Sequence, residues 1–147
     1  VGDLGEAWDF ATLNRAFRLL MQKPQPQLIA LGMTRYWQAD DGLRLDVAPF
    51  VVALSHAAAV EPLVLGKPAA PFYRLAVDLL QADGAPVVMV GDDIRGDIDG
   101  AQKAGVDAVL VRAGKSRASE LELGIRPNAV LDGIGGLPAW YESTCLR

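Results

Sequence analysis

The later half of the chain alternates short apolar runs with helical segments, and this alternation is what most limits its fold. The expected order is strand 62–65, helix 69–82, strand 87–90, helix 95–104, strand 108–111, strand 129–131 and helix 134–143. The run Val87-Val88-Met89-Val90 contains no polar residue, as is typical of a parallel strand covered on both faces. Strands joined through helices of this length predict a parallel α/β sheet with a Rossmann-like arrangement.

The earlier part of the chain has a different pattern, which predicts a smaller α/β unit with its boundary near residue 66. The elements expected here are a helix over 11–22 capped by Asp9, a strand at 28–31, a hairpin over 33–45 that turns at Asp41-Gly42, and a helix over 48–59 capped by Asp46. The two helix starts are predicted because an aspartate side chain can accept a hydrogen bond from the first turn of a helix.

Composition and charge exclude several classes of function. Lys and Arg number 14 against 18 Asp and Glu, a formal net charge of −4, which argues against a nucleic-acid partner or an anionic membrane surface. No apolar run is long enough to cross a bilayer, and the only cysteine, Cys145, cannot form an internal disulfide. A cytoplasmic protein is expected. Because the sequence opens at Val1 without a methionine, we expect the chain to begin inside a larger polypeptide.

Acidic residues gather directly after the central apolar run. Asp92, Asp93 and Asp97 follow it, and open α/β sheets bind ligands at the carboxyl ends of their strands. Carboxylates packed together repel one another unless a cation is present, and Mg²⁺ commonly takes one or two carboxylates with waters and a substrate phosphate. Asp92 is therefore predicted as a Mg²⁺ ligand, with Asp93 and Asp97 at the same site. The alternative is that Asp93 and Asp97 only cap the start of a helix.

A second polar signal follows the strand expected at 62–65. In Gly66-Lys67-Pro68 the lysine stands between a residue that frees the backbone and one that fixes it. A lysine at a phosphate site acts as a point positive charge on the phosphoryl oxygens. Lys67 is therefore predicted to bind a phosphoryl group, and an ordinary surface lysine is the alternative.

Together these segments resemble the third and fourth motifs of the haloacid dehalogenase superfamily, in its branch of capped phosphatases. The matching segments are Gly66-Lys67-Pro68, Gly91-Asp92-Asp93 with Asp97, Gly100-Ala101-Gln102 with Ala104-Gly105, and Arg112-Ala113-Gly114-Lys115. The segments 13–17 and 42–50 are similar to the cap domain of that branch. The resemblance implies that 1–66 is the C-terminal part of an α/β cap domain and 67–147 the C-terminal part of a Rossmann-like hydrolase core.

The resemblance implies a Mg²⁺-dependent phosphatase that acts on a small phosphorylated substrate, either a phosphoric monoester, a phosphoamide or a pyrophosphate. By the family's pattern, Asp92 and Asp93 ligate Mg²⁺, and Asp97 supports both the metal and the lysine. Lys67 then stabilises the phosphoryl group while it is attached to a nucleophilic aspartate.

Arg35 and Tyr36 lie where caps of this branch place a loop that faces the substrate. They are predicted to contact the substrate by charge and by stacking. The alternatives for this segment are an exposed hairpin or a dimer contact. Relatives with this type of cap often pair, so the resemblance allows a homodimer, although the sequence does not fix the oligomeric state.

Two motifs of the family are missing from the sequence. One is an apolar strand that ends in Asp-x-Asp, which supplies the nucleophile and the general acid/base, and the other is a strand that ends in Ser or Thr. Both belong before the cap, so the chain alone is predicted to be inactive. The alternative from another class is a module without catalysis that binds Mg²⁺ and phosphate or forms dimers. Such a module would be either a pseudoenzyme or a receiver-like domain.

Overall fold

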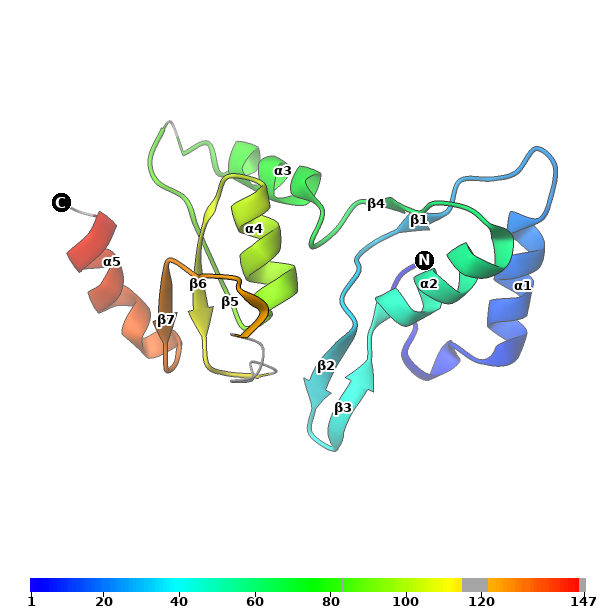
Figure 1. The fold of residues 1–147 in the computed structure, drawn as a ribbon, viewed down its shortest axis with the longest axis horizontal. Coiled ribbons are helices and arrows are strands. Elements are labelled where there is room, and N and C mark those ends of the chain that lie inside the picture. The colour runs from blue at the N-terminus through cyan, green and yellow to red at the C-terminus, as the bar shows by residue number, and fades with distance from the viewer. Residues whose placement is uncertain (83, 115–121, 146–147) are drawn as a thin grey trace. The chain divides into compact units, whose positions relative to one another are not determined.

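The computed structural model describes residues 1–82, 84–114 and 122–145. The chain divides into two compact units, an N-terminal unit (Val1–Ala69) and a C-terminal unit (Ala70–Arg147), whose elements are labelled in Figure 1. Lys115, at the end of the last matching motif, lies outside the described residues.

Both helices of the N-terminal unit begin at an aspartate, as the sequence predicts. After a short 3-10 turn, η1 (Gly5–Ala7), the Asp9 carboxylate accepts a 2.7 Å hydrogen bond from an amide in the first turn of α1 (Phe10–Leu20). The Asp46 carboxylate accepts a 2.6 Å bond from the first amide of α2 (Val47–Ala58). Each bond satisfies an amide that has no partner within the helix, and both predicted helices are confirmed.

Two small sheets complete the N-terminal unit. β1 (Ile29–Ala30) pairs in parallel with β4 (Leu63–Val64), and β2 (Tyr36–Ala39) pairs antiparallel with β3 (Gly42–Leu45). The strands predicted at 28–31 and 62–65 are confirmed as the shorter β1 and β4. The core of the unit consists of Leu20, Leu28, Ala30, Val47, Val51, Leu54 and Ala58.

The hairpin predicted over 33–45 is confirmed, with β2 and β3 as its arms. Its turn is at Asp40 and Asp41, one residue earlier than expected. The reason is that Gly42, whose φ of +130° suits glycine, already pairs with Ala39 as the first residue of β3.

The C-terminal unit is built on a three-stranded parallel sheet in the order β5-β6-β7. Its strands are β5 (Val88–Gly91), β6 (Asp107–Val111) and β7 (Ala129–Leu131). Residues 108–111 of the central strand β6 are all buried. The prediction that the run at 87–90 is covered on both faces is wrong, because β5 lies at the edge of this three-stranded sheet and is half-buried along its length. The predicted parallel α/β sheet is confirmed.

Helices α3 (Ala70–Leu80) and α4 (Gly100–Lys103) share a core with this sheet (Figure 1). The residues of that core are Tyr73, Ile94, Ile98, Ala101, Ala108 and Leu110. A 3-10 turn, η4 (Ile134–Gly136), and α5 (Leu137–Cys145) occupy the segment predicted as the closing helix. None of the helices in the described part of the chain combines the length and apolar character needed to cross a bilayer.

The helix predicted over 95–104 forms only in its second half, as α4. The first half is a π-helical turn, η2 (Ile94–Asp99), in which the Ile98 amide donates to the Asp93 carbonyl five residues earlier, at 3.2 Å. The wider turn lets Ile94 and Ile98 both reach the core while the Asp97 side chain turns back toward β5. Apolar spacing does not distinguish this turn from an α-helix, because π-turns are rare and short.

Candidate active site

Asp97 is the most buried of the acidic residues that follow β5. Its side chain is only 4% exposed, and its carboxylate accepts a 3.2 Å hydrogen bond from the Asp93 amide. A Cβ at Gly91, the last residue of β5, would overlap the Asp97 carboxylate. The glycine at the strand end therefore makes room for this carboxylate to lie against the backbone.

Asp93 caps the π-turn, which is the alternative role that the sequence predicts for this residue. One carboxylate oxygen accepts a 3.0 Å hydrogen bond from the Arg95 amide. A Cβ at Gly96 would overlap the other carboxylate oxygen. Asp93 therefore orders the turn through both its amide and its side chain. Its role as a metal ligand stays a prediction.

Asp92 is held differently, because its contact comes from another part of the chain. Its half-buried carboxylate lies against Gly114, in the turn that follows β6. The two strand ends are neighbours, since Gly91 pairs with Leu110 in the parallel sheet. The three predicted acids all follow the carboxyl end of β5, and we call Asp92, Asp93 and Asp97 the acid turn.

Tyr73 contacts the segment of the acid turn through its hydroxyl group. Tyr73 was not identified from the sequence as part of the site. It is 3% exposed on α3, and its hydroxyl donates a short hydrogen bond to the Gly96 carbonyl. Burial raises the pKa of Tyr73 above its usual value, and the negative charges of Asp97, Asp93 and Asp99 raise it further. A tyrosine within an apolar helical face gives no sequence signal that distinguishes it from ordinary core.

The donors of the acid turn suit a hard divalent cation. Carboxylate oxygens are what Mg²⁺ prefers, and Mg²⁺ usually takes only one or two of them from the protein, filling its other positions with water and substrate phosphate. Among the residues that the structure describes, no group of three or more His, Cys, Asp or Glu side chains is arranged to hold a metal ion.

Lys67 lies in the N-terminal unit, directly after β4. Its carbonyl accepts a 2.8 Å hydrogen bond from the Met33 amide. A Cβ at Gly66 would overlap the Leu31 carbonyl oxygen, so only glycine lets the segment pack this closely against the end of β1. The backbone that carries Lys67 is therefore fixed, and the side chain is half-buried.

Arg35 and Tyr36 also belong to the N-terminal unit and lie at the base of the hairpin. The Arg35 guanidinium carbon is 5.4 Å from the centre of the Tyr36 ring, within the range of a cation–π interaction. The Arg35 carbonyl accepts a 3.1 Å hydrogen bond from the Asp46 amide, which ties the hairpin to α2. Their role in substrate binding stays a prediction.

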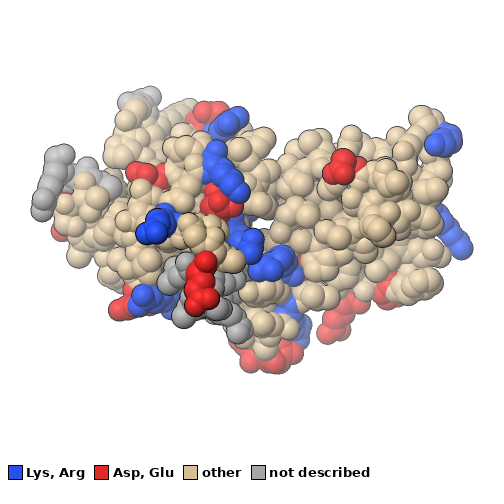
Figure 2. Space-filling view, in the orientation of Figure 1, with Lys and Arg blue, Asp and Glu red and all other residues tan. Residues whose placement is uncertain are grey.

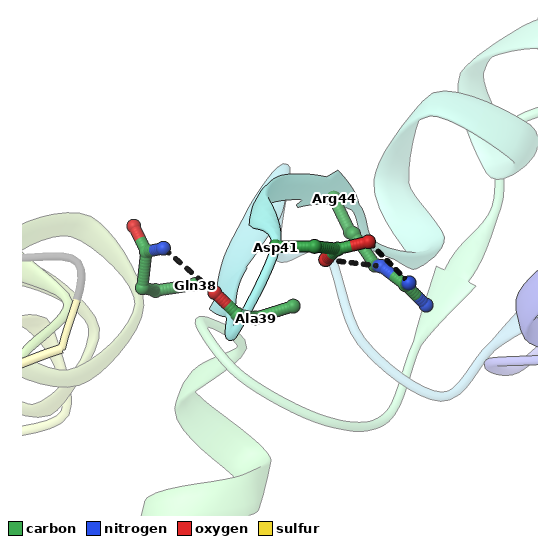
Figure 3. A network of polar contacts seen from close by, with 4 residues as sticks. All are labelled: Gln38, Ala39, Asp41 and Arg44. Atoms are coloured by element: carbon green, nitrogen blue, oxygen red, sulfur yellow. Dashed lines mark hydrogen bonds and ion pairs between the residues drawn. The ribbon is translucent and has the colours of Figure 1, made fainter.

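The far end of the hairpin carries an exposed ion pair. Figure 3 shows the Arg44 guanidinium against the Asp41 carboxylate, with two hydrogen bonds of 2.7 and 3.1 Å, and the Gln38 amide donating to the Ala39 carbonyl. The Arg44 bond lowers the pKa of Asp41, and the same bond raises the pKa of Arg44. This pair stabilises the turn locally and lies on the surface of the unit.

The predicted site residues thus fall into two groups. The acid turn belongs to the C-terminal unit, whereas Lys67, Arg35 and Tyr36 belong to the N-terminal unit. Each group is ordered by bonds within its own unit, and their convergence on one phosphate stays a prediction. On the face seen in Figure 2, Lys and Arg are interspersed with Asp and Glu, and most of the visible surface is uncharged.

Comparison with known proteins gives a consistent result. The HAD-hydrolase-like family model matches residues 64–137, about half of the chain. Human phospholysine phosphohistidine inorganic pyrophosphate phosphatase is 41% identical over 120 residues, which cover 82% of this chain and 44% of that protein. The chain spans about half the length of the curated relatives it matches.

Two solved structures show the same fold. A p-nitrophenyl phosphatase from Archaeoglobus fulgidus is 27% identical, with a TM-score of 0.79, over 95% of this chain and 55% of that one. A glycerol phosphate phosphatase from Mycobacterium tuberculosis, solved in complex with magnesium, is 24% identical, with a TM-score of 0.72, over 91% of this chain and 40% of that one. These neighbours support a Rossmann-like core with a cap.

Proposed function

Because this chain belongs to the haloacid dehalogenase superfamily of hydrolases, we propose that it is the C-terminal part of a Mg²⁺-dependent phosphatase. The observation that carries the proposal is the acid turn, in which three aspartates follow the carboxyl end of the parallel strand β5. Ligands of open α/β sheets bind at that edge. In this proposal residues 1–66 are the later part of the cap and residues 67–147, which include Lys67, are the later part of the core.

Within the acid turn, the three aspartates have different tasks. Asp92 and Asp93 are the proposed Mg²⁺ ligands. Asp97 acts through the turn, because its buried carboxylate accepts the Asp93 amide and so fixes where Asp93 lies. When bound, Mg²⁺ neutralises negative charge on the phosphoryl oxygens.

In the proposed reaction, Lys67 places a positive charge on the phosphoryl group. The phosphorus forms a bond to an aspartate oxygen supplied by an earlier part of the full-length protein, while its bond to the leaving group breaks. Water then hydrolyses the aspartyl-phosphate, releasing inorganic phosphate. Arg35 and Tyr36 are proposed to contact the leaving group.

The substrate is proposed to be a small phosphorylated molecule, whether a phosphoric monoester, a phosphoamide or a pyrophosphate. One relative is named a phospholysine phosphohistidine inorganic pyrophosphate phosphatase, and another a glycerol phosphate phosphatase, which supports this range of phosphate compounds. Residence in the cytoplasm and pairing of two copies through the cap belong to the same proposal.

The test compares the 147-residue chain with the full-length gene product, using p-nitrophenyl phosphate with and without Mg²⁺. We expect turnover only from the full-length protein and only with Mg²⁺, and loss of that turnover in Asp92→Asn. Lys67→Met should lower kcat by about 100-fold or more, the usual effect of removing one group that stabilises developing charge. Asp78→Asn is the matched control, because this exposed aspartate of α3 makes the same charge change outside the acid turn.

Three results would contradict the proposal. Mg²⁺-dependent hydrolysis by the 147-residue chain, lost in Asp92→Asn, would show that the chain needs no external nucleophile. Full activity of the Asp92→Asn full-length protein would remove the assigned metal ligand. A full-length protein that binds Mg²⁺ and inorganic phosphate without turnover would favour the alternative, a binding or dimerisation module without catalysis.

A further inference from the structure

The acidic residues of the acid turn each lie against a glycine, but one of these contacts differs from the other two. Asp97 and Asp93 lie against Gly91 and Gly96, which belong to the same short segment. Asp92 lies against Gly114, which belongs to the turn after the next strand. The position of the Asp92 carboxylate therefore depends on a separate piece of backbone.

The geometry at Gly114 shows what any larger residue would displace. A Cβ built at Gly114 would overlap the Asp92 Oδ2 atom. It would lie 3.1 Å from the Asp92 Cγ and 3.8 Å from the Asp92 Cβ. The obstructing atom is the end of a side chain, so the carboxylate can rotate away without moving either strand. A substitution at this position would therefore act on the direction of Asp92.

Other glycines of the same unit show that backbone conformation does not account for this contact. Gly114 has a φ of +53°, and Gly105 and Gly124 have φ values of +83° and +77°. All three are left-handed, which favours glycine, but nothing lies within 4 Å of a Cβ built at Gly105 or at Gly124. Of these three glycines, only Gly114 has a carboxylate in the space that the Cβ of a larger residue would occupy.

We propose that Gly114 is a positioning residue for Asp92, and that the turn after β6 sets the direction of the proposed metal ligand. The metal-binding role of Asp92 rests on the proposed function. The positioning role of Gly114 rests on the contact between Gly114 and the Asp92 carboxylate. Outer contacts that orient a metal ligand typically change metal affinity by about 10- to 100-fold when they are altered. Without this contact, the turn would only continue the chain after β6.

The experiment compares Gly114→Ala with Gly105→Ala in the 147-residue chain. Both variants place an alanine at a left-handed position, so the backbone strain is similar, but only the first displaces the Asp92 carboxylate. The first measurement is the side-chain χ1 angle of Asp92, obtained from three-bond NMR couplings. The second is the affinity for Mn²⁺, used as a paramagnetic stand-in for Mg²⁺, obtained from the electron paramagnetic resonance signal of the free ion.

We expect a changed Asp92 χ1 distribution and about 10- to 100-fold weaker Mn²⁺ binding in Gly114→Ala, with neither change in Gly105→Ala. An unchanged χ1 in Gly114→Ala overturns the positioning role whatever the Mn²⁺ result. If the unsubstituted chain and Asp92→Asn bind Mn²⁺ equally, the proposed metal role of Asp92 fails while the χ1 comparison still decides the inference.

A second pair of variants covers the case in which Gly114→Ala does not fold. Asparagine adopts the left-handed conformation more readily than other residues with a side chain, so Gly114→Asn and Gly105→Asn carry less backbone strain. The expected contrast in χ1 and Mn²⁺ affinity is the same as for the alanine pair. Equal results at the two positions contradict the inference.

Discussion

The acid turn of the C-terminal unit and the hairpin of the N-terminal unit both carry charged side chains, but they hold them in opposite ways. Asp97 is 4% exposed and accepts a backbone amide, and its neighbours in the turn fit against glycines. In the hairpin, the paired side chains of Arg44 and Asp41 are 48% and 63% exposed. One arrangement is fixed by packing, and the other is a surface ion pair in water.

The difference shows where a change in geometry costs the most free energy. A buried carboxylate that loses its hydrogen bond keeps its desolvation penalty, so the Asp97 side chain is held in the arrangement that keeps this bond. An exposed ion pair exchanges its partner for water with little change in free energy, so the hairpin can rearrange. Fixed geometry suits the metal and phosphate chemistry proposed for the turn.

The largest loss of stability is expected from a substitution that fills the space occupied by the Asp97 carboxylate. In Gly91→Ala, the new methyl group would lie 2.5 Å from the Cγ and 2.6 Å from the Cβ of Asp97, too close for rotation of the carboxylate alone to relieve. We expect the free energy of unfolding to fall by about 3 kcal/mol, as for other overpacked cores, in urea denaturation followed by circular dichroism. Gly133→Ala is the matched control, because its site is open and should show no comparable loss.

A smaller effect should follow from removing the hydroxyl under the turn. Tyr73→Phe leaves the Gly96 carbonyl without its buried donor, which should lower the free energy of unfolding by about 1.5 kcal/mol near neutral pH. Tyr141→Phe, on an exposed tyrosine of α5, is the control. Equal stability of the two variants would show that the hydroxyl does not hold the acid turn.

The same variant makes a prediction about pH. The pKa of Tyr73 is raised in the folded protein, so above about pH 10 the unfolded chain releases this proton while the folded chain keeps it. The stability that Tyr73 contributes is therefore fully present below pH 10 and falls as the pH rises beyond it. Urea denaturation at several pH values should show the difference between wild type and Tyr73→Phe narrowing only above about pH 10.

The smallest effect is expected in the hairpin. Asp41→Asn removes the ion pair with Arg44, but both side chains are exposed, so the urea midpoint should not change measurably. Asp40→Asn makes the same charge change at the neighbouring turn residue and should give the same midpoint. A clear loss of stability in Asp41→Asn alone would mean that the hairpin is held as firmly as the acid turn.

The fold could largely be predicted because its signals are local. Asp9 and Asp46 mark helix starts through bonds that span only a few residues, and the apolar run before Gly91 marks a parallel strand. The π-turn over Ile94–Asp99 could not be predicted. Its winding is decided by where the Asp97 side chain fits, and that depends on the packed structure rather than on apolar spacing.

The candidate site was predicted less completely than the fold. The acids were found because they follow a strand end, where ligands bind in this class of sheet. The supporting groups Tyr73 and Gly114 were missed as supports, because each acts through a contact with a segment far away in the sequence. Such contacts depend on how strands and helices pack against one another, which no motif spacing records.

The π-turn has a consequence for how this protein can vary. Asp93 and Asp97 face each other only because the chain between them has a fixed number of residues wound in a wide turn. Arg95, which is exposed, can be exchanged for another residue type, but a one-residue deletion would rotate Asp97 about the helix axis, away from the Asp93 amide. Length is therefore a stricter requirement than composition here, and insertions or deletions should be tolerated elsewhere in the unit long before they are tolerated in this turn.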